Sequence, residues 1–124
     1  MDIKALVTDS SSKVRKNLTR SLNEIGVRNV VEATDGSQAI ELMGKGKFDI
    51  VFAEWNSMTG TGEELVKTLR RTDAKTPIIV TAPQSKKIED LKRSYPNASN
   101  YLTMPFNTDQ LKRTVAQYVP SIAS

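Results

Sequence analysis

The chain has 124 residues, of which 38% are hydrophobic, and a formal net charge of +4; this length suits one domain with one core and is too short for two. It contains no Cys and no His, which excludes a disulfide framework, a thiolate metal site and acid–base catalysis by histidine. The basic balance permits weak, salt-sensitive attraction to anionic surfaces, but no nucleic-acid recognition motif accompanies it, so we expect no direct nucleic-acid binding.

The N-terminal segment predicts a short apolar strand. Met1 to Lys4 leads directly into the strand Ala5–Thr8, which argues against a signal peptide. No apolar run approaches the length of a membrane span. We therefore expect a soluble, cytoplasmic protein with no membrane partner.

A helix over about Ser12–Ile25 follows, because its apolar residues recur at helical spacing on one face. Ser10, Ser11 or Ser12 is suited to cap its start, and Gly26 to end it in the left-handed region. The apolar face consists of Val14, Leu18, Leu22 and Ile25.

The middle of the chain repeats the pattern of strand and helix. The sequence predicts a short strand at Val30–Val31, a helix over Ser37–Met43 and a strand over Asp49–Ala53. Gly44 and Gly46 are expected to break the helix. We expect this helix to bury Ala39, Ile40 and Met43, and the next helix, which follows Gly60 and Gly62, to turn Leu65, Val66 and Leu69 inward.

The C-terminal half adds two further strand–helix pairs. Strands are predicted over Ile78–Thr81 and Asn100–Thr103, with a helix over about Ser85–Ser94 between them. That helix has two apolar anchors, Ile88 and Leu91, which makes it the most weakly buried one and a candidate for partner binding. Thr108 is predicted to cap a last helix, with Asp109 in its first turn and an inner face of Leu111, Val115, Tyr118 and Val119.

Five alternations of strand and helix predict a parallel sheet that is covered on both faces. Polar side chains stand where the strands end: Asp9, Glu54 and Thr81 each follow or close an apolar run. The carboxyl ends of parallel strands open onto one crevice, where ligands and chemistry collect. We therefore expect these residues to share one site.

Six segments together carry a family resemblance. In order and spacing they resemble the response-regulator receiver domain of two-component signalling, of the single-domain chemotaxis type. This implies a flavodoxin-like, doubly wound (βα)5 fold with a five-stranded parallel sheet in strand order 2-1-3-4-5, and a single receiver domain over residues 1–124. The segments are Lys4–Ser11, Glu32–Gly36, Phe48–Val51, Glu54–Asn56, Thr76–Ala82 and Tyr101–Phe106.

The chain departs from this family at the residues that handle phosphate. The family's second acid after strand one falls on Ser10, its phosphoacceptor Asp on Glu54 and its switch Lys on Met104. The hydroxyl switch is kept as Thr81 and the aromatic switch as Tyr101. The resemblance therefore implies a receiver with degenerate phosphorylation chemistry and a Met104–Pro105 bond that is cis in the family.

The resemblance also implies a degraded Mg²⁺ site. Asp9, Glu54 and the carbonyl of Asn56 remain as ligands, while Ser10 supplies a neutral hydroxyl in place of a charge. Mg²⁺ prefers hard oxygen ligands that include carboxylates. We expect no cofactor, or Mg²⁺ bound with millimolar or weaker affinity.

Each of these residues also has a plainer interpretation. Asp9 suits hydrogen bonding at the start of the first helix, Glu54 is compatible with a solvated carboxylate, and Thr81 with a backbone hydrogen bond at a strand end. Met104 suits apolar packing, and so does the ring of Tyr101. Trp55, which flanks the site, is open to a role as a lid or as a partner contact.

The leading functional interpretation is a receiver that is not phosphorylated by the usual mechanism and acts as a protein-interaction module rather than an enzyme. The family implies a histidine kinase, an output domain or another signalling protein as partner, bound through the fourth helix, fifth strand and fifth helix. Candidate contacts there are Lys86, Lys87, Tyr101 and Lys112.

Two alternatives stay open. One is a phosphorylation-competent receiver that accepts a phosphoryl group at an altered site. The other is a flavodoxin-like ligand binder or phosphotransfer enzyme, for which the loop after strand one lacks the glycine-rich pattern that cradles phosphate.

Overall fold

Five parallel strands form one sheet in the order β2-β1-β3-β4-β5, as the family resemblance implied. The computed structural model describes residues 2–55 and 61–122. The strands are β1 (Lys4–Thr8), β2 (Asn29–Ala33), β3 (Ile50–Glu54), β4 (Ile78–Pro83) and β5 (Asn100–Met104). The helices are α1 (Ser12–Glu24), α2 (Gly36–Lys45), α3 (Thr61–Thr72), α4 (Ile88–Ser94), α5 (Thr108–Ala116) and the 3₁₀ turn η1 (Pro120–Ile122).

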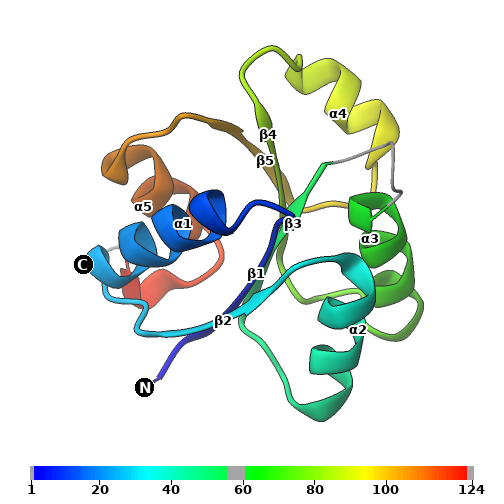
Figure 1. Ribbon diagram of the computed structural model, residues 1–124, viewed down its shortest axis with the longest axis horizontal. Coiled ribbons are helices and arrows are strands. Elements are labelled where there is room, and N and C mark those ends of the chain that lie inside the picture. Colours follow the sequence, from blue (N-terminus) through cyan, green and yellow to red (C-terminus); the bar gives the residue numbers. More distant parts are fainter. Residues whose placement is uncertain (1, 56–60, 123–124) are drawn as a thin grey trace.

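The helices cover both faces of the sheet, with α1 and α5 on one side and α2, α3 and α4 on the other (Figure 1). Strands β1, β3 and β4 lie in the middle and read as continuous apolar runs, because both of their faces are buried. Leu6, Phe52 and Ile79 are fully buried there. Two core layers result, one on each face, and together they hold the strand ends in a fixed arrangement.

The first helix agrees with the sequence. Its N-cap is Ser11, whose hydroxyl accepts a hydrogen bond from the Val14 N–H at 3.2 Å. The chain turns at Gly26 with φ of 103°, a conformation that only glycine adopts without steric cost. Leu18 and Leu22 are buried beneath the helix.

Several predicted boundaries were wrong around α2 and β3. Gly44 lies inside α2, and Gly46 is its C-cap; the helix begins after Asp35, whose carboxylate caps the Gln38 N–H at 2.8 Å. Strand β2 is longer than Val30–Val31 because it pairs with β1 along its full length. Strand β3 is displaced by one residue and includes Glu54, which therefore has a fixed place in the sheet.

The C-terminal elements also needed correction. Helix α4 begins at Ile88 rather than Ser85, and Tyr95 at its C-cap is buried and anchors it further. Helix α5 is capped by Asn107 rather than Thr108, because Asn107 and Gln110 form a reciprocal capping box.

The end of the described chain packs against the core. Tyr118 and Val119 lie beyond the end of α5 and not within it, and η1 then buries Ile122. The Met104–Pro105 bond is cis. Within residues 2–55 and 61–122, every helix is too short or too polar to cross a membrane.

Candidate functional site

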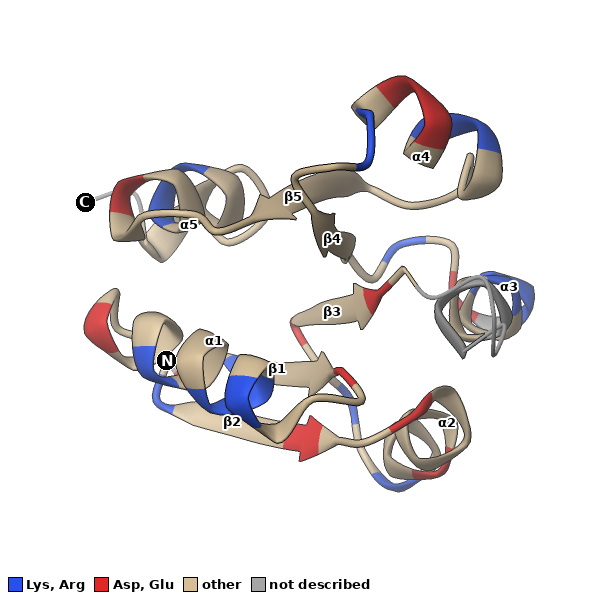
Figure 2. Cartoon of the chain, turned by 45° about the horizontal axis from the view of Figure 1, so that its top comes forward, with Lys and Arg blue, Asp and Glu red and all other residues tan. Residues whose placement is uncertain are grey.

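The carboxyl edge of the sheet brings the predicted residues together. Glu54, the last residue of β3, is the register partner of Thr81 in β4. Asp9 directly follows β1, and its N–H donates to the Ala33 carbonyl at 3.1 Å. The acidic end of β3 is visible as its red tip in Figure 2. The grouping that the strand-end rule predicted is therefore present.

Both carboxylate oxygens of Glu54 are bound by Ser10. The Ser10 N–H donates to Oε1 at 3.0 Å, and the Ser10 hydroxyl donates to Oε2 at 3.2 Å. Glu54 is half-buried. Among the ion pairs within the described residues, none involves Glu54. The Glu54 side chain thus reaches Ser10, the residue that follows Asp9.

Asp9 is buried and electrostatically unfavourable as an anion. Only 4% of its surface is exposed, and burial raises the pKa of its carboxyl to about 6, with the Glu54 carboxylate adding to the rise. The Ser11 N–H, which donates to Oδ1 at 2.8 Å, and the charge of Arg15 act in the opposite direction. Arg15 directs its own donors to the Asp9 backbone carbonyl and to Glu32.

The two switch positions and the Lys-equivalent position differ in their surroundings. Thr81 is buried, and its carbonyl accepts the Trp55 N–H at 2.7 Å. The Tyr101 hydroxyl donates to the Tyr95 carbonyl at 2.6 Å, and burial raises its pKa. Met104 is half-buried and ends β5, so it places an uncharged thioether at this strand end.

A cation–π contact closes the site on the side of α4. The Lys86 ammonium lies 4.1 Å from the centroid of the Trp55 ring. The same β4–α4 segment is tied to the next strand end, because the Gln84 side chain donates to the Pro105 carbonyl at 3.1 Å. Sequence reasoning had assigned Lys86 to a partner surface; the structure places its charge over Trp55.

Two of the three predicted magnesium ligands, Asp9 and Glu54, lie at this edge of the sheet. Within residues 2–55 and 61–122, no group of three or more His, Cys, Asp or Glu is arranged to hold a metal. Burial raises the pKa of the Asp9 carboxyl to about 6, which leaves it largely ionised at pH 7, and the Ser10 hydroxyl donates to Glu54. Asn56, the third predicted ligand, lies outside the described residues.

The face of α4, β5 and α5 carries a groove of about 350 Å³. Tyr101 lines it, as expected for a candidate contact, but Lys86, Lys87 and Lys112 are not among its lining residues. The cation that lines it is Arg113, which sequence reasoning missed. The spacing of Gln110, Arg113 and Gln117 could have revealed Arg113, because residues three or four positions apart share one face of a helix. The groove is lined by Ile88, Tyr101, Leu102, Thr103, Gln110, Arg113, Thr114 and Gln117.

Comparison with protein families gives one match over most of the chain. The model of the response regulator receiver domain matches residues 5–116. The chemotaxis protein CheY of Pseudomonas aeruginosa is 25% identical over 115 residues, which cover 91% of this chain and 93% of that protein.

Solved structures agree with this match. The chain resembles chemotaxis protein CheY4 of Vibrio cholerae with a TM-score of 0.84 and 27% identity, over 95% of this chain and 99% of that one. It also shares the fold of the response regulator TrrA of Thermotoga maritima, with a TM-score of 0.82, 24% identity and coverage of 94% and 98%. That structure was solved in complex with Mg²⁺ and BeF.

Proposed function

The chain belongs to the response-regulator receiver family of two-component signalling, and on that premise we propose that it acts as a protein-interaction module whose state is not set by phosphorylation. The double hydrogen bond from Ser10 to Glu54 carries this proposal. It occupies the carboxylate that stands at the family's phosphoacceptor position.

Phosphoryl transfer to a carboxylate has three requirements: an oxygen free to attack in line, a metal that bridges phosphate and protein, and donors that neutralise the transferring oxygens. Each oxygen of Glu54 already accepts a hydrogen bond from Ser10. Glutamate also moves the reacting oxygen by roughly 1 Å from the aspartate position, a displacement that can cost about 100-fold in rate. Met104 supplies no charge to the transferring oxygens.

The residues that remain at the edge support a structural role. Ser10 donates to Glu54, Ser11 donates to Asp9, and the Lys86 ammonium lies over the Trp55 ring. These contacts connect β1, β3 and the β4–α4 segment without any phosphate. We propose that this network stabilises a single conformation of the segment between β4 and α4, which contains Gln84 and Lys86.

The partner surface that we propose is the groove of α4, β5 and α5. Helix α4 is short, and Leu91 is the one residue within it that is buried, which is typical of an element that a partner can shift. Tyr101 and Arg113 line the groove, and aromatic and arginine side chains are enriched in binding hot spots. A histidine kinase, an output domain or another signalling protein fits this surface as the family implies.

Intact mass after treatment with acetyl phosphate and Mg²⁺ tests the proposal. We expect no phosphoryl adduct on the parent chain. The matched variant carries Ser10→Asp, Glu54→Asp and Met104→Lys together, and we expect it to gain one adduct. A stoichiometric adduct on the parent that disappears in Glu54→Gln would overturn the proposal and favour the phosphorylation-competent alternative, in which Asp9 and Thr81 suffice.

A further inference from the structure

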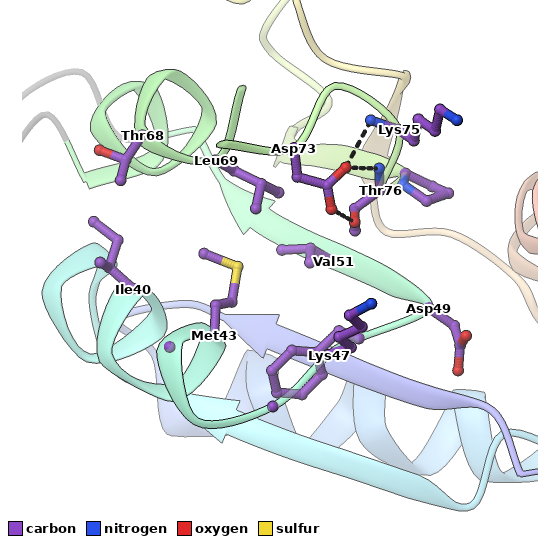
Figure 3. Close-up of a pocket in the computed structure, with 14 residues that line it drawn as sticks. Ile40, Met43, Lys47, Asp49, Val51, Thr68, Leu69, Asp73, Lys75 and Thr76 are labelled. Atoms are coloured by element: carbon purple, nitrogen blue, oxygen red, sulfur yellow. Dashed lines mark hydrogen bonds between the residues drawn. The ribbon is translucent and has the colours of Figure 1, made fainter. Parts of the chain in front are cut away.

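A second hollow lies at the end of the sheet that is opposite to the Glu54 site. It has a volume of about 640 Å³ and is bounded by α2, α3 and the segments that enter β3 and β4 (Figure 3). Asp49 at this end and Glu54 at the other are five residues apart along an extended chain, which corresponds to about 16 Å. The hollow is therefore separate from the Glu54 site, and we call it the α2–α3 pocket.

The interior of the α2–α3 pocket is apolar. Ile40 and Met43 enter from α2, Leu69 from α3 and Val51 from β3, and Figure 3 shows these side chains around one shared space. Ile40 and Met43 are partly buried, so they keep apolar surface that a ligand can cover. Ligand sites of about 300–1,000 Å³ commonly combine such a lining with a few polar groups.

The carboxylates at the rim are already engaged by the protein. Asp73 accepts the Lys75 N–H at 2.8 Å, the Thr76 N–H at 3.0 Å and the Thr76 hydroxyl, and these bonds, the hydroxyl first, lower its pKa to about 2. Asp49 accepts the Lys4 N–H at 2.8 Å. Both oxygens of Asp73 and one oxygen of Asp49 are thus directed to the protein's own donors.

The lysines at the rim, unlike the carboxylates, have no partner for their charged groups within the described residues. Lys47 and Lys75 line the pocket, and within the described residues neither ammonium takes part in an ion pair. Lys4 adds a third ammonium nearby, 4.8 Å from the centroid of the Phe48 ring. The rim therefore holds two lysines outside any ion pair beside the charged carboxylates of Asp49 and Asp73, over an apolar interior.

We propose that the α2–α3 pocket binds a small amphipathic carboxylate, with its alkyl or aryl part between α2 and α3 and its anionic group at Lys47 and Lys75. The apolar part covers Ile40, Met43 and Leu69, and the carboxylate receives charge-assisted hydrogen bonds. This site is independent of the proposed function, since it involves neither Glu54 nor the α4–β5–α5 groove.

Gly44 gives a direct way to close the pocket. It lies in α2 and lines the pocket, and a Cβ added to it meets no heavy atom within 4 Å. A Cβ there has room, and replacing glycine inside a helix with alanine favours folding. Gly44→Phe therefore adds bulk to the pocket lining without a clash at Cβ, and Gly44→Ala is its matched control.

The experiment titrates the full ¹⁵N-labelled chain with decanoate below its micelle concentration and follows the backbone amides by NMR. We expect saturable shifts centred on residues 43–49 and 73–76, with a dissociation constant of about a millimolar or lower. Gly44→Phe should weaken binding at least tenfold, and Gly44→Ala should leave it unchanged. The double variant Lys47→Gln and Lys75→Gln should weaken binding about tenfold while its amide spectrum stays folded.

Two further probes with the same alkyl chain length test whether the pocket requires an anionic head group. Decyltrimethylammonium and decanol should bind at least tenfold more weakly than decanoate. The proposal is overturned by non-saturable shifts with decanoate, by undiminished binding to Gly44→Phe, or by equal binding of the cationic probe. Equal binding of decanol would overturn the assignment of the lysines.

Discussion

Ser10 binds Glu54 twice, with its backbone N–H on one carboxylate oxygen at 3.0 Å and its hydroxyl on the other at 3.2 Å. The two residues are 44 positions apart and meet because β1 and β3 are neighbouring parallel strands. We propose that the two residues compensate each other, since an acid at position 10 would repel Glu54 rather than bind it.

Removing the Ser10 hydroxyl should loosen this contact. We expect Ser10→Ala to lower the free energy of unfolding by about 0.5–1 kcal/mol, because one hydrogen bond to a charged, partly exposed group is lost while the backbone bond remains. Urea denaturation measures the change. Ser12→Ala is the control, since Ser12 is exposed and Ser11 is the helix cap; an equal loss in both variants would contradict the prediction.

Asp9 should make stability depend on pH. Its pKa rises from 3.8 to about 6 on folding, so the native state binds the proton more tightly than the unfolded chain. Asp9→Asn should therefore raise the free energy of unfolding at pH 7 by about 1–3 kcal/mol. The advantage of the variant should shrink as pH falls from about 6 towards 4, where native Asp9 is protonated.

Urea denaturation of the parent and of Asp9→Asn at about pH 4.5 and pH 7 checks this prediction. Native Asp9 is mostly protonated at the lower of these pH values and mostly ionised at the higher one. A constant difference between the two proteins would mean that Asp9 titrates normally.

Magnesium should have little effect on the parent chain. Trp55 adjoins Glu54 and reports on the site, so its fluorescence should show no saturable change below millimolar Mg²⁺. Ser10→Asp restores a carboxylate beside Asp9 and should tighten Mg²⁺ binding at least tenfold, because hard anionic oxygens are the preferred ligands. Submillimolar, saturable binding to the parent would refute the expectation of a degraded metal site.

The contact between Lys86 and Trp55 predicts a measurable coupling. Lys86→Ala should cost about 0.5–1 kcal/mol of stability, the usual size of an exposed cation–π contact, and should shift the Trp55 emission. Lys87→Ala is the matched control, since Lys87 is exposed and makes no side-chain cap bond. Identical emission spectra for the parent and Lys86→Ala would show that the contact is not populated in solution.

Substitutions at two neighbouring residues at the start of α5 should differ in their effect on stability. Asn107→Ala should lower the free energy of unfolding by about 1 kcal/mol, because it removes the capping box with Gln110. Thr108→Ala should cost less than about 0.5 kcal/mol, since its hydroxyl makes one long bond of 3.3 Å to Glu24. Thermal unfolding of both variants decides which residue is the cap.

Local pattern predicted the number and order of elements, but not all of their ends. Gly44 was expected to break α2 and lies within it, because the packing of α2 against its neighbours outweighs the low helix propensity of glycine. Thr108 and Asn107 are both good caps, and Gln110, three residues after Asn107, was the sequence signal that favours Asn107. Tyr95 was missed as an anchor because it follows the last helical residue of α4.

The sequence by itself determined the alternation of strands and helices, the apolar faces, and the arrival of Asp9, Glu54 and Thr81 at one edge, because each depends on spacing along the chain and on the parallel sheet that this spacing implies. Tertiary structure alone decided that Ser10 occupies Glu54, that Lys86 covers Trp55, and that an apolar pocket opens between α2 and α3. These contacts join residues far apart in the chain. Strand register and helix packing set their geometry, and neither is encoded in any local pattern.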